Sequence, residues 1–596
     1  MAFHQDAVRL LEQIGHMMEL LGEDSFKASA HSRAARVIGD LPFDLATVAG
    51  DRDKLLAIDG VGQKIADKIV EFRATGRMKE HDELLSRVPP SLLSVLEVPG
   101  LGPKTVRVLW QQGGVTDIAS LRKIIDDGSI LKLPRMGEKS VEKIKQSLAF
   151  AAGGTQRLAL GAAMPVAELI VARIEKMPDV KHVAFAGSLR RGRDTIGDID
   201  ILVSTDDGAA ASSAFCSMPE VEQIIASGET KSSVRVSLEK VFPNGGAPRG
   251  TVQVDLRVVA PASYGAGLLY FTGSKEHNVA LRERALKMGL TLNEYGLFPD
   301  DNEKTPPQAR GIKPVAAKTE EQIYKALKLP FVPPEIREDR GEFDLKDTPK
   351  LIEIGDIKAE LHAHTIASDG TMSIAELART AKARGFHTIA VTDHSQSSTI
   401  ANGLRPDRLR LHIDAIRKAR DEVDGITILA GSEVDILADG RLDYTDELLA
   451  ELDIVIASPH ASLSQDPPTA TQRLLKAIAN PFVHILGHPT GRLINKRPGL
   501  SPDMPELIAA AKEHRVALEI NAHWMRLDLR DVHVKAAIDA GCVIAIDCDV
   551  HAPEDFDNLR YGVLTARRGW VTPDSCINTW APKKLHAWLK AKGPRA

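Results

Sequence analysis

The sequence has 596 residues, which is too long for one hydrophobic core and predicts about three to five domains. Its formal net charge of −5 excludes a protein that coats nucleic acid through bulk positive charge. No apolar run approaches the roughly 20 residues that span a bilayer, and the four cysteines show no CxxC spacing, so we expect a cytoplasmic protein without membrane contact, disulfide framework or cysteine zinc site.

Three segments near the start of the chain resemble one another. Each predicts a short apolar helix, a tight glycine-containing turn and a second helix that carries Lys or Arg. The segments are LLAIDGVGQKIADKIVEF (55–72), LLSVLEVPGLGPKTVRVLW (92–110) and GSILKLPRMGEKSVEKIKQSL (128–148). Glycine at both ends of the turn lets the backbone bend sharply and direct consecutive N–H groups at an anion, which needs no large positive charge.

These segments resemble helix-hairpin-helix DNA-binding motifs. Backbone N–H groups grip phosphate without reading bases, which agrees with equal numbers of basic and acidic residues, 21 of each, in residues 1–150. Ordinary helical hairpins with glycine C-caps are the alternative, but three copies in one chain favour DNA. The candidate DNA-binding residues are Gly60, Gly62 and Lys64 in the first segment and Gly100, Gly102 and Lys104 in the second, whereas Arg135 replaces the first glycine of the third.

Acidic residues mark the middle of the chain. Residues 183–203, VAFAGSLRRGRDTIGDIDILV, predict a strand, a glycine-rich turn with two arginines, and a second strand. Asp198 and Asp200 are two residues apart on that strand, so we expect their carboxylates on one face about 7 Å apart, and Asp255 lies in a later β-rich run, TVQVDLRVV (251–259). Three carboxylates on neighbouring strands could hold two divalent ions about 4 Å apart for in-line phosphoryl displacement. Solvated acids on an open strand face are the alternative.

Four motifs here, GSLRRG, GDIDIL, VDLR and YFTGSKEHN, resemble the palm and nucleotide-binding subdomains of a family X DNA polymerase, in the same order and at similar spacing. The resemblance covers residues 1–320 and implies that Asp198, Asp200 and Asp255 are catalytic ligands of Mg²⁺ or Mn²⁺, with Asp255 nearest to the attacking primer 3′-hydroxyl. It also implies a nucleotide site in which Gly187, Ser188 and Arg191 meet the β- and γ-phosphates, Tyr270, Phe271 and Gly273 line the sugar pocket, and Asn278 and Arg282 touch the minor groove of the nascent pair.

The first repeat also resembles the small deoxyribose-phosphate lyase subdomain of such polymerases. In GVGQKIADKIVEFRATG, Lys68 aligns with the Schiff-base lysine and would be a catalytic residue. Such a nucleophile needs a depressed pKa, which we expect Lys64, one turn earlier, to supply by crowding. His31 and Ser32 stand where relatives usually have an aromatic-basic pair, and simple phosphate contact is the alternative role for both lysines.

The nineteen histidines are unevenly placed, and many fall in the last part of the chain. There, apolar β-runs alternate with amphipathic helices, as in a barrel or closed parallel sheet, and nearly every run ends in a His, Asp or Glu. The candidate metal ligands are His362, His364, Asp369, His394, Glu433, His460, His488, Asp549 and His551. Nine nitrogen and oxygen donors without thiolate suit zinc, manganese or iron and exceed one structural site, so we expect two or three ions bridged by a carboxylate.

This set resembles the polymerase-and-histidinol-phosphatase (PHP) domain, a distorted (β/α)7 barrel with a trinuclear centre. All nine ligand positions of that family are filled, which implies an active site with up to three Zn²⁺ or Mn²⁺ ions and Glu433 as the bridging carboxylate. We expect Arg492, in GHPTGRL, to meet a substrate phosphate and Asp393 to support the ligands. The sequence departs from the family at INAHWMRLD (520–528), where we expect His523 and Trp524 to alter the substrate rim.

The sequence therefore predicts a multidomain chain with a helical helix-hairpin-helix N-terminal region, an α+β nucleotidyltransferase palm and a C-terminal distorted (β/α)7 PHP barrel. A proline-rich, charged stretch before the barrel predicts a linker. The expected boundaries are 1–90 for a lyase-like DNA-binding subdomain, 91–152 for a second helix-hairpin-helix subdomain, 153–262 for the palm, 263–325 for a nucleotide-binding subdomain, 326–352 for the linker and 353–590 for the PHP domain.

These patterns predict a monomeric DNA repair polymerase that fills short gaps in gapped or nicked DNA with dNTPs. The PHP domain is expected to act as a 3′–5′ exonuclease, with cutting at abasic sites or trimming of blocked 3′ ends as further candidates. Two alternatives stay open: a small-molecule nucleotidyltransferase fused to a histidinol-phosphatase-like phosphoesterase, and a DNA-end-binding scaffold with vestigial sites. The three hairpins argue against the first, and the complete carboxylate and histidine sets argue against the second.

Overall fold

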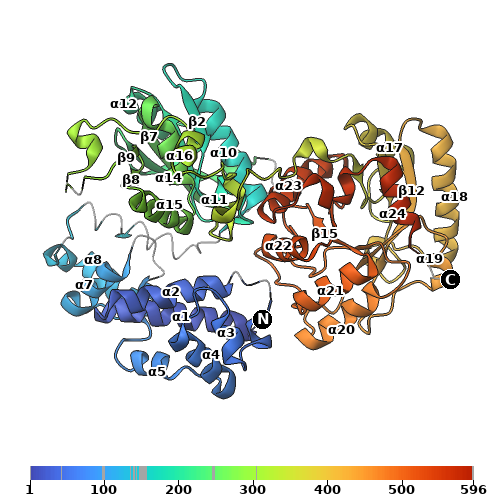
Figure 1. Ribbon diagram of the computed structural model, residues 1–596, viewed down its shortest axis with the longest axis horizontal. Helices are drawn as coiled ribbons and strands as arrows, with labels where there is room; N and C mark the ends of the chain where they lie inside the picture. Colours follow the sequence, from blue (N-terminus) through green and yellow to red (C-terminus); the bar gives the residue numbers. More distant parts are fainter. Residues whose placement is uncertain are drawn as a thin grey trace. The chain divides into compact units, whose positions relative to one another are not determined.

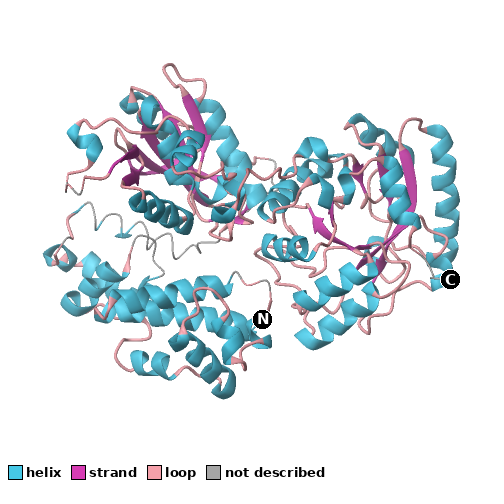
Figure 2. Ribbon diagram, viewed as in Figure 1, coloured by secondary structure: helices cyan, strands magenta, loops and turns pink. Residues whose placement is uncertain are grey.

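The computed structural model (Figure 1) describes residues 2–592 except 40, 42, 97–100, 135, 139–140, 142–143, 146–156, 244–248, 302 and 304. The chain divides into two compact units, Met1–Gln156 and Arg157–Ala596. Helices build the first unit, whereas the second combines strands with helices (Figure 2). Among the described residues, no helix is long and apolar enough to cross a lipid bilayer.

The helices of the first unit enclose one hydrophobic core. They are α1 (Ala2–Leu21), α2 (Ser25–Gly39), α3 (Arg52–Leu56), α4 (Gln63–Thr75), α5 (Lys79–Leu85), α6 (Leu92–Leu96), α7 (Pro103–Gly113) and α8 (Ile118–Asp126). On α1, Ala7, Leu11, Ile14 and Met18 are buried at intervals of three or four residues, the spacing of a helix that turns one apolar stripe inward. The core of this unit therefore follows from the helical spacing of its apolar residues.

The first two hairpins expected from the sequence lie in this unit. In the first, α3 and α4 are joined across Gly60, whose φ of +84° lies in the left-handed region that favours glycine, and α4 starts directly after Gly62. In the second, α7 starts directly after Gly102, whereas Gly100 lies outside the described residues. The third, 128–148, is described only in part, from the 3₁₀ helix Ser129–Lys132 onwards, and Arg135 is not among the described residues.

The palm is built on a five-stranded sheet with the order β2-β4-β7-β6-β5. Its elements are β2 (His182–Phe185), β4 (Ile199–Ser204), β5 (Val221–Ala226), β6 (Lys231–Ser237), β7 (Thr251–Val259), α10 (Leu160–Ile174), α12 (Gly208–Cys216) and α13 (Leu238–Val241), and a separate pair joins β1 (Leu158–Ala159) to β3 (Thr195–Ile196). Ile199, Ile201 and Val203 of β4 pack with α10 and α12, so Asp200 and Leu202 face the other way. One face of the sheet is a core, which leaves the opposite face to the acids.

The following segment forms a second cluster of its own. It consists of α14 (Tyr264–Thr272), α15 (Lys275–Lys287), the hairpin of β8 (Leu290–Asn293) and β9 (Gly296–Pro299), and α16 (Glu320–Ala326). Residues 326–352, which we expected to form a linker, are packed into this cluster through the buried side chains of Leu329, Val332 and Ile336. The connection to the barrel is therefore anchored by apolar residues and is not a free spacer.

The C-terminal part is a parallel seven-stranded sheet whose strands follow chain order from β10 to β16. The strands are β10 (Ala359–Glu360), β11 (Thr388–Val391), β12 (Thr427–Asp435), β13 (Ile454–Ser458), β14 (Ile485–Leu486), β15 (Ala517–Asn521) and β16 (Ile544–Asp547). Ala363, just after β10, bridges Val550, just after β16, so the first and last strands meet in a nearly closed barrel. The fold class expected from the sequence is confirmed.

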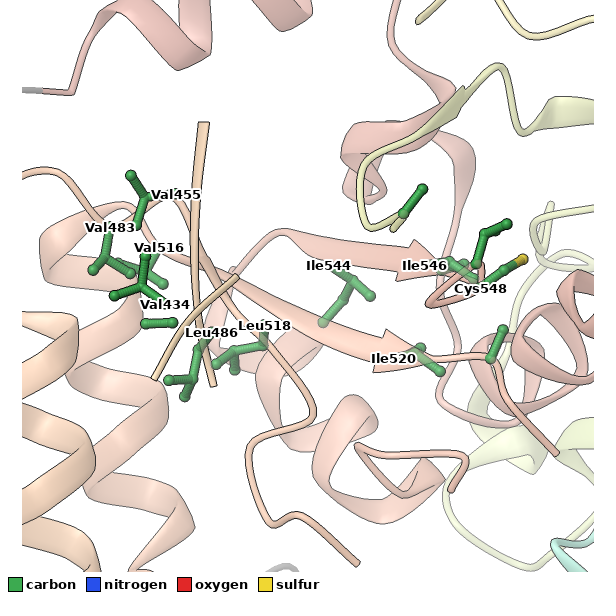
Figure 3. Packing of buried hydrophobic residues seen from close by; sticks show 14 of the residues in the cluster. Val434, Val455, Val483, Leu486, Val516, Leu518, Ile520, Ile544, Ile546 and Cys548 are labelled. Carbon is green, nitrogen blue, oxygen red and sulfur yellow. The ribbon is translucent and has the colours of Figure 1, made fainter. Parts of the chain in front are cut away.

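The barrel has two apolar layers, one between the strands and the surrounding helices and one inside the barrel. The helices are α17 (Ile374–Ala383), α18 (Pro406–Glu422), α19 (Asp446–Leu449), α20 (Pro467–Ile478), α21 (Met504–His514), α22 (Asp531–Ala540), α23 (Leu559–Arg568) and α24 (Pro582–Lys590). On β13, Val455 and Ala457 join the large outer cluster, part of which Figure 3 shows. Ile454 and Ile456 join the inner cluster, to which α24 adds Leu585. The inner cluster fills the barrel interior, which leaves the C-terminal strand ends to polar residues.

A charged cluster is buried beside α16. Glu320 accepts hydrogen bonds from both terminal nitrogens of Arg190, at 2.9 and 2.7 Å, and from Arg337 at 2.6 Å. The Arg337 side chain is fully buried. Burial raises the pKa of Glu320, but the two guanidinium groups outweigh burial and hold the pKa at about 2. Without the carboxylate charge, both guanidinium groups would lack their counterion in a buried place.

Replacing Glu320 by Gln is expected to lower the free energy of unfolding by about 3 kcal/mol at neutral pH, because an uncompensated charge is left buried. Since the folded-state pKa lies below the ordinary value of 4.5, the stabilisation by Glu320 is fully present above pH 4.5 and is lost as the pH falls to about 2. Urea denaturation at neutral and acidic pH, followed by tryptophan fluorescence, measures the difference. Glu321→Gln, an exposed neighbour on α16, is the control, and a pH-independent difference would contradict this account.

Candidate active sites

The three acids of the palm come together across a parallel strand pair. Asp200 on β4 lies opposite Asp255 on β7 in the strand register, and neighbouring strands are about 4.8 Å apart. Asp198 stands in a bend just before β4 and is more exposed than Asp200. Lys231 Nζ lies 2.9 Å from one carboxylate oxygen of Asp255, and Gln253 Nε2 donates to the other at 3.0 Å. The register therefore places Asp200 beside Asp255, on the face of the sheet that points away from α10 and α12.

Crowding of these acids changes their pKa values. Burial and the charges of Asp198 and Asp255 raise the pKa of Asp200 to about 7, and burial with Asp255 raises the pKa of Asp198. Burial also acts to raise the pKa of Asp255, but hydrogen bonds from Lys231 and Gln253 outweigh burial and lower it. Carboxylates held this close form an all-oxygen donor set, which fits hard divalent ions such as Mg²⁺ or Mn²⁺.

The glycine-rich turn lies directly beside these acids. Gly187, the first residue of α11 (Gly187–Arg190), has a φ of +59°, and a β-carbon there would overlap the Asp200 carboxylate, so this approach requires glycine. Ser188 follows on α11 and is partly exposed. Arg191 Nη1 donates to the carbonyl oxygen of Thr272 at the end of α14. The turn thereby links the acids to the segment expected to line the sugar pocket.

That segment holds the remaining residues of the expected nucleotide site. The rings of Tyr270 and Phe271 meet edge to face with their centroids 5.2 Å apart. Gly273 lies so close to Arg191 that a β-carbon would be 3.1 Å from its Nη1. Asn278 Nδ2 donates to the carbonyl oxygen of Tyr270 at 2.7 Å, and Arg282 follows one turn later on α15. Tyr270 and Phe271 thus contact each other, Asn278 contacts Tyr270, and Gly273 lies against Arg191.

The nine expected metal ligands of the barrel gather where its strands end. Glu433, on β12, stands at the centre: its carboxylate oxygens lie within 3.7 Å of ring nitrogens of His362, His364, His394, His460 and His488. Asp549 lies 3.1 Å from His364 Nε2 and 3.6 Å from His362 Nε2. Asp369 lies 3.4 to 3.9 Å from nitrogens of His551, His394 and His364. The structure therefore brings all nine residues into one cluster.

Their donor atoms form three overlapping groups, each compact enough for one ion. The groups are His364, Asp369, His394 and His551; His362, His364 and Asp549; and His394, Glu433 and His460. Several buried donor atoms have no hydrogen-bond partner among the described residues, namely His362 Nε2, His364 Nδ1, His394 Nδ1, His488 Nδ1 and Glu433 Oε2. His394 Nδ1 and Glu433 Oε2 are 2.9 Å apart but are not aligned as hydrogen-bond donor and acceptor. Two atoms that bind the same ion have this kind of arrangement. Nitrogen and oxygen donors of this kind fit Zn²⁺ or Mn²⁺.

Three residues that sequence reasoning missed support these ligands. Glu519 Oε1 lies 2.6 Å from His362 Nδ1, and Asp435 Oδ1 lies 2.5 Å from His460 Nδ1. Asn521 Nδ2 donates to Asp549 Oδ2 at 3.0 Å. Such partners fix the orientation of a ligand ring and the nitrogen it offers. A signal was present, because Glu519 and Asp435 are acids inside mainly apolar β-runs, VALEIN and ITILAGSEVDIL.

The expectation for Arg492 is wrong. Its guanidinium pairs with Asp194 of the palm at 3.0 Å and donates to the carbonyl oxygens of Arg526 and Leu527 at 2.8 and 2.5 Å. These partners take up all three guanidinium nitrogens and bury the side chain, so Arg492 is not available to a substrate phosphate. Arg492 instead joins the barrel to the palm.

Of two further residues, Trp524 lies elsewhere than expected, whereas Asp393 has the supporting place that was expected of it. Trp524 packs into the palm cluster beside Gly161, where a β-carbon would overlap its side chain, so it belongs to the contact with the palm rather than to a substrate rim. Asp393 accepts hydrogen bonds from Thr365 and Ser368, at 2.9 and 2.5 Å for their hydroxyls. Asp393 thereby holds the loop that leads to Asp369 and supports this expected ligand.

The lysines of the first unit have different surroundings. Lys64 and Lys104 are exposed in the first turns of α4 and α7. Lys68 Nζ lies 2.8 Å from Glu80 Oε2 and donates to the carbonyl oxygen of Lys64 at 3.2 Å. His31 and Lys68 together hold the pKa of Glu80 at about 2. Lys68 therefore has a carboxylate partner, where crowding by the Lys64 cation was expected.

Comparisons with known proteins match this arrangement. Family models match a helix-hairpin-helix domain at 4–78, a SAM-like helix-hairpin-helix tandem at 92–149, the DNA polymerase beta palm at 163–242, the DNA polymerase beta thumb at 267–338 and a PHP domain at 360–523. The DNA polymerase/3′-5′ exonuclease PolX of Bacillus subtilis (strain 168) is 36% identical over 589 residues, 98% of this chain and 99% of that protein. The chain belongs to the PolX family.

Other relatives match one part of the PolX architecture. A probable phosphatase of Thermoanaerobacter sp. (strain X514) is 30% identical over 244 residues, 39% of this chain and 94% of that protein. DNA polymerase lambda of Arabidopsis thaliana is 25% identical over 348 residues, 56% of this chain and 62% of that protein. Membership of the PolX family confirms the resemblance to family X polymerases that carry a PHP domain.

Replacing Glu433 by Gln is expected to weaken metal binding by the barrel at least about tenfold, because this carboxylate contacts five histidines and belongs to one donor group. Inductively coupled plasma mass spectrometry after dialysis against Mn²⁺ or Zn²⁺ counts the ions retained per chain. Glu422→Gln, an exposed residue at the end of α18, is the control. Equal metal content in both variants would contradict a central role for Glu433.

Proposed function

We propose that this PolX-family protein is a DNA repair polymerase that fills short gaps with dNTPs and also degrades DNA from the 3′ end. Gapped or nicked DNA is the substrate, two Mg²⁺ or Mn²⁺ ions serve the palm, and up to three Zn²⁺ or Mn²⁺ ions serve the barrel. The observation that carries the proposal is the presence of two separate donor sets in one chain, one of carboxylates and one rich in histidine. The relative with 98% coverage is named for both activities.

In the polymerase reaction, Asp255 is the acid nearest to the attacking 3′-hydroxyl. Lys231 and Gln253 hold its carboxylate in place opposite Asp200. Ser188 offers a hydroxyl and Arg191 a guanidinium fork to the β- and γ-phosphates. Tyr270, Phe271 and Gly273 line the sugar pocket, and Asn278 and Arg282 touch the minor groove of the nascent pair, as the family resemblance implies.

In the barrel, the chain holds its ligands in fixed orientations. Glu519 fixes His362, Asp435 fixes His460, and Asn521 fixes Asp549. Divalent ions, when bound at the palm or barrel, stabilise charge on a phosphoryl group and make an attacking hydroxyl or water more acidic. The palm offers only oxygen donors and the barrel mostly histidine nitrogens, so each reaction has its own set of ligands.

The hairpins of the first unit provide the grip on duplex DNA. Helices α4 and α7 begin directly after Gly62 and Gly102 without a side-chain cap, and each carries an exposed lysine in its first turn. Backbone N–H groups and one lysine suit a phosphate of the DNA backbone. In this proposal, Lys68 acts as a lyase nucleophile only when a bound substrate displaces Glu80 from it.

A small-molecule nucleotidyltransferase fused to a histidinol-phosphatase-like phosphoesterase is the alternative that keeps both folds. Its strongest support is the probable phosphatase that matches the barrel. The two described hairpins favour DNA, because a small substrate needs no grip on a duplex.

Separate inactivation of the two sites tests the proposal. Asp255→Asn is expected to slow primer extension on gapped DNA about 1000-fold, because the loss of one ion-binding charge removes several kcal/mol of transition-state stabilisation. His364→Ala is expected to abolish degradation of single-stranded DNA, because His364 belongs to two donor groups. Each variant retains the other activity, and Asp206→Asn, an exposed acid after β4, retains both. If each site variant kept both activities, the two-site assignment would be wrong.

Arg526 is the candidate contact for a substrate phosphate in the barrel, in place of Arg492. Its Nε lies 3.8 Å from Asp549 Oδ2, beyond hydrogen-bond distance, and its side chain is 20% exposed. Its guanidinium donates no hydrogen bond to another described residue. Burial lowers the pKa of His488 to about 4, and the charge of Arg526 acts in the same direction. A charged fork with unused donors at the metal cluster suits phosphate oxygens.

Arg526→Met is expected to lower kcat/KM for DNA degradation about 10- to 100-fold, since a charge-assisted hydrogen bond to the phosphate is lost. The measurement is steady-state degradation of a labelled single strand, with metal content determined in parallel and expected to be unchanged. Arg492→Met is the contrast: it should lower stability through loss of the Asp194 pair. A full loss of metal in Arg526→Met, or unchanged kcat/KM, would refute the phosphate contact.

A further inference from the structure

Arginine and carboxylate side chains join the palm to the barrel within the second unit. Some of these pairs are partly exposed, such as Arg560 of α23 with Glu168 of α10. Others are buried: the side chain of Arg568, the last residue of α23, is 2% exposed. Arg568 reaches the glycine-rich turn that carries Arg191, although it belongs to the barrel.

Arg568 connects three segments of the chain. Its Nη1 donates to the backbone oxygen of Arg191 at 2.7 Å and to Glu338 Oε1 at 2.9 Å. Its Nη2 donates to Asp531 Oδ2, at the start of α22, at 2.8 Å. Arg340 donates to the same Asp531 oxygen at 2.9 Å. One guanidinium therefore ties the backbone of the turn to two barrel helices and to the connection before the barrel.

Glu338 extends this constraint to the side chain of Arg191. Its Oε1 accepts from Arg568 and also from Arg191 Nε, at 3.0 Å. Burial raises the pKa of Glu338, but Arg568 and Arg191 outweigh burial and hold the pKa at about 2. Because Arg191 Nη1 donates to Thr272, the guanidinium is held at two of its nitrogens. Its Nη2 makes no hydrogen bond with a described residue and stays available to a ligand.

The hydrogen bonds that hold the Arg191 guanidinium affect how it binds a phosphate. A free arginine side chain samples many rotamers, and a ligand must restrict them before it gains a bidentate contact. An arginine already held at Nε and Nη1 avoids that loss of freedom when the ligand arrives. Because Arg568 holds both Glu338 and the Arg191 backbone, its removal loosens the turn and the side chain together.

We propose that Arg568, a residue of the barrel, is a positioning residue for dNTP binding in the palm. It acts through Glu338 and the backbone of Arg191. The inference rests on the proposed function, in which Arg191 meets the nucleotide phosphates. It means that the barrel contributes to nucleotide binding in addition to its own metal chemistry.

Gap filling by the full chain, with dNTP varied, tests this role. Arg568→Met is expected to raise KM for the dNTP about tenfold and to leave kcat within about twofold, since the fault lies in ligand positioning. Mn²⁺-dependent degradation of single-stranded DNA should be unchanged. Arg560→Met, which breaks another contact from α23 to the palm, should change neither KM nor degradation. Arg568→Met combined with Glu338→Gln should give no higher KM than the larger single effect, because the two residues act in one chain of contacts.

Arg191→Met separates this inference from the proposed function. If Arg191→Met raises KM but Arg568→Met does not, the positioning role is overturned while Arg191 keeps its role. If Arg191→Met leaves KM unchanged, Arg191 is not a phosphate ligand and the inference falls with it. Arg568→Lys decides the matter if Arg568→Met fails to fold: one ammonium nitrogen cannot take the places of both Nη1, which contacts Arg191 and Glu338, and Nη2, which contacts Asp531. A raised KM with intact degradation then supports the role, and an unchanged KM overturns it.

Discussion

A buried carboxylate among five histidine rings is the constraint on which the barrel site depends. Glu433 occupies the end of a central strand, and burial of its charge would be unfavourable without cationic partners. The barrel tolerates this arrangement because parallel strands deliver one polar residue after another to the same rim, while the interior below is filled by apolar side chains. Buried donor atoms that lack a hydrogen-bond partner among the described residues fit a cluster organised for ions rather than for internal pairing.

The palm also holds charged side chains close together, but these are carboxylates without histidines. Strand register places Asp200 opposite Asp255, and Gly187 lets the backbone of the turn approach the same acids. Repulsion between carboxylates is offset for Asp255 by Lys231 and Gln253, whereas Asp200 keeps a raised pKa. The palm therefore presents only oxygen donors and the barrel mostly nitrogen donors, within one PolX-family chain.

Buried arginines connect these two sites within the second unit. Glu320 joins Arg190 of the glycine-rich turn to Arg337, and Glu338 joins Arg191 to Arg568 of the barrel. Arg190 and Arg191 of the turn are thus held by carboxylates from segments that follow the palm in sequence. The segment between palm and barrel, with its apolar anchors, is part of this contact and not a passive spacer.

The amino-acid sequence by itself determined the fold class and the two described hairpins, and it predicted the three palm acids and the nine barrel residues that the structure brings close together. Local patterns carry this information, since glycine-rich turns, alternating strands and polar residues at strand ends each reflect short-range geometry. Tertiary structure alone decided the partners of long, charged side chains. Arg492 and Arg526 look alike in sequence, yet Arg492 closes on Asp194, almost 300 positions away, while Arg526 faces the metal cluster. The ammonium group of Lys68 likewise pairs with Glu80 instead of lying beside the Lys64 cation. Such side chains have several rotatable bonds and reach distant segments, so their partners follow from packing and not from spacing.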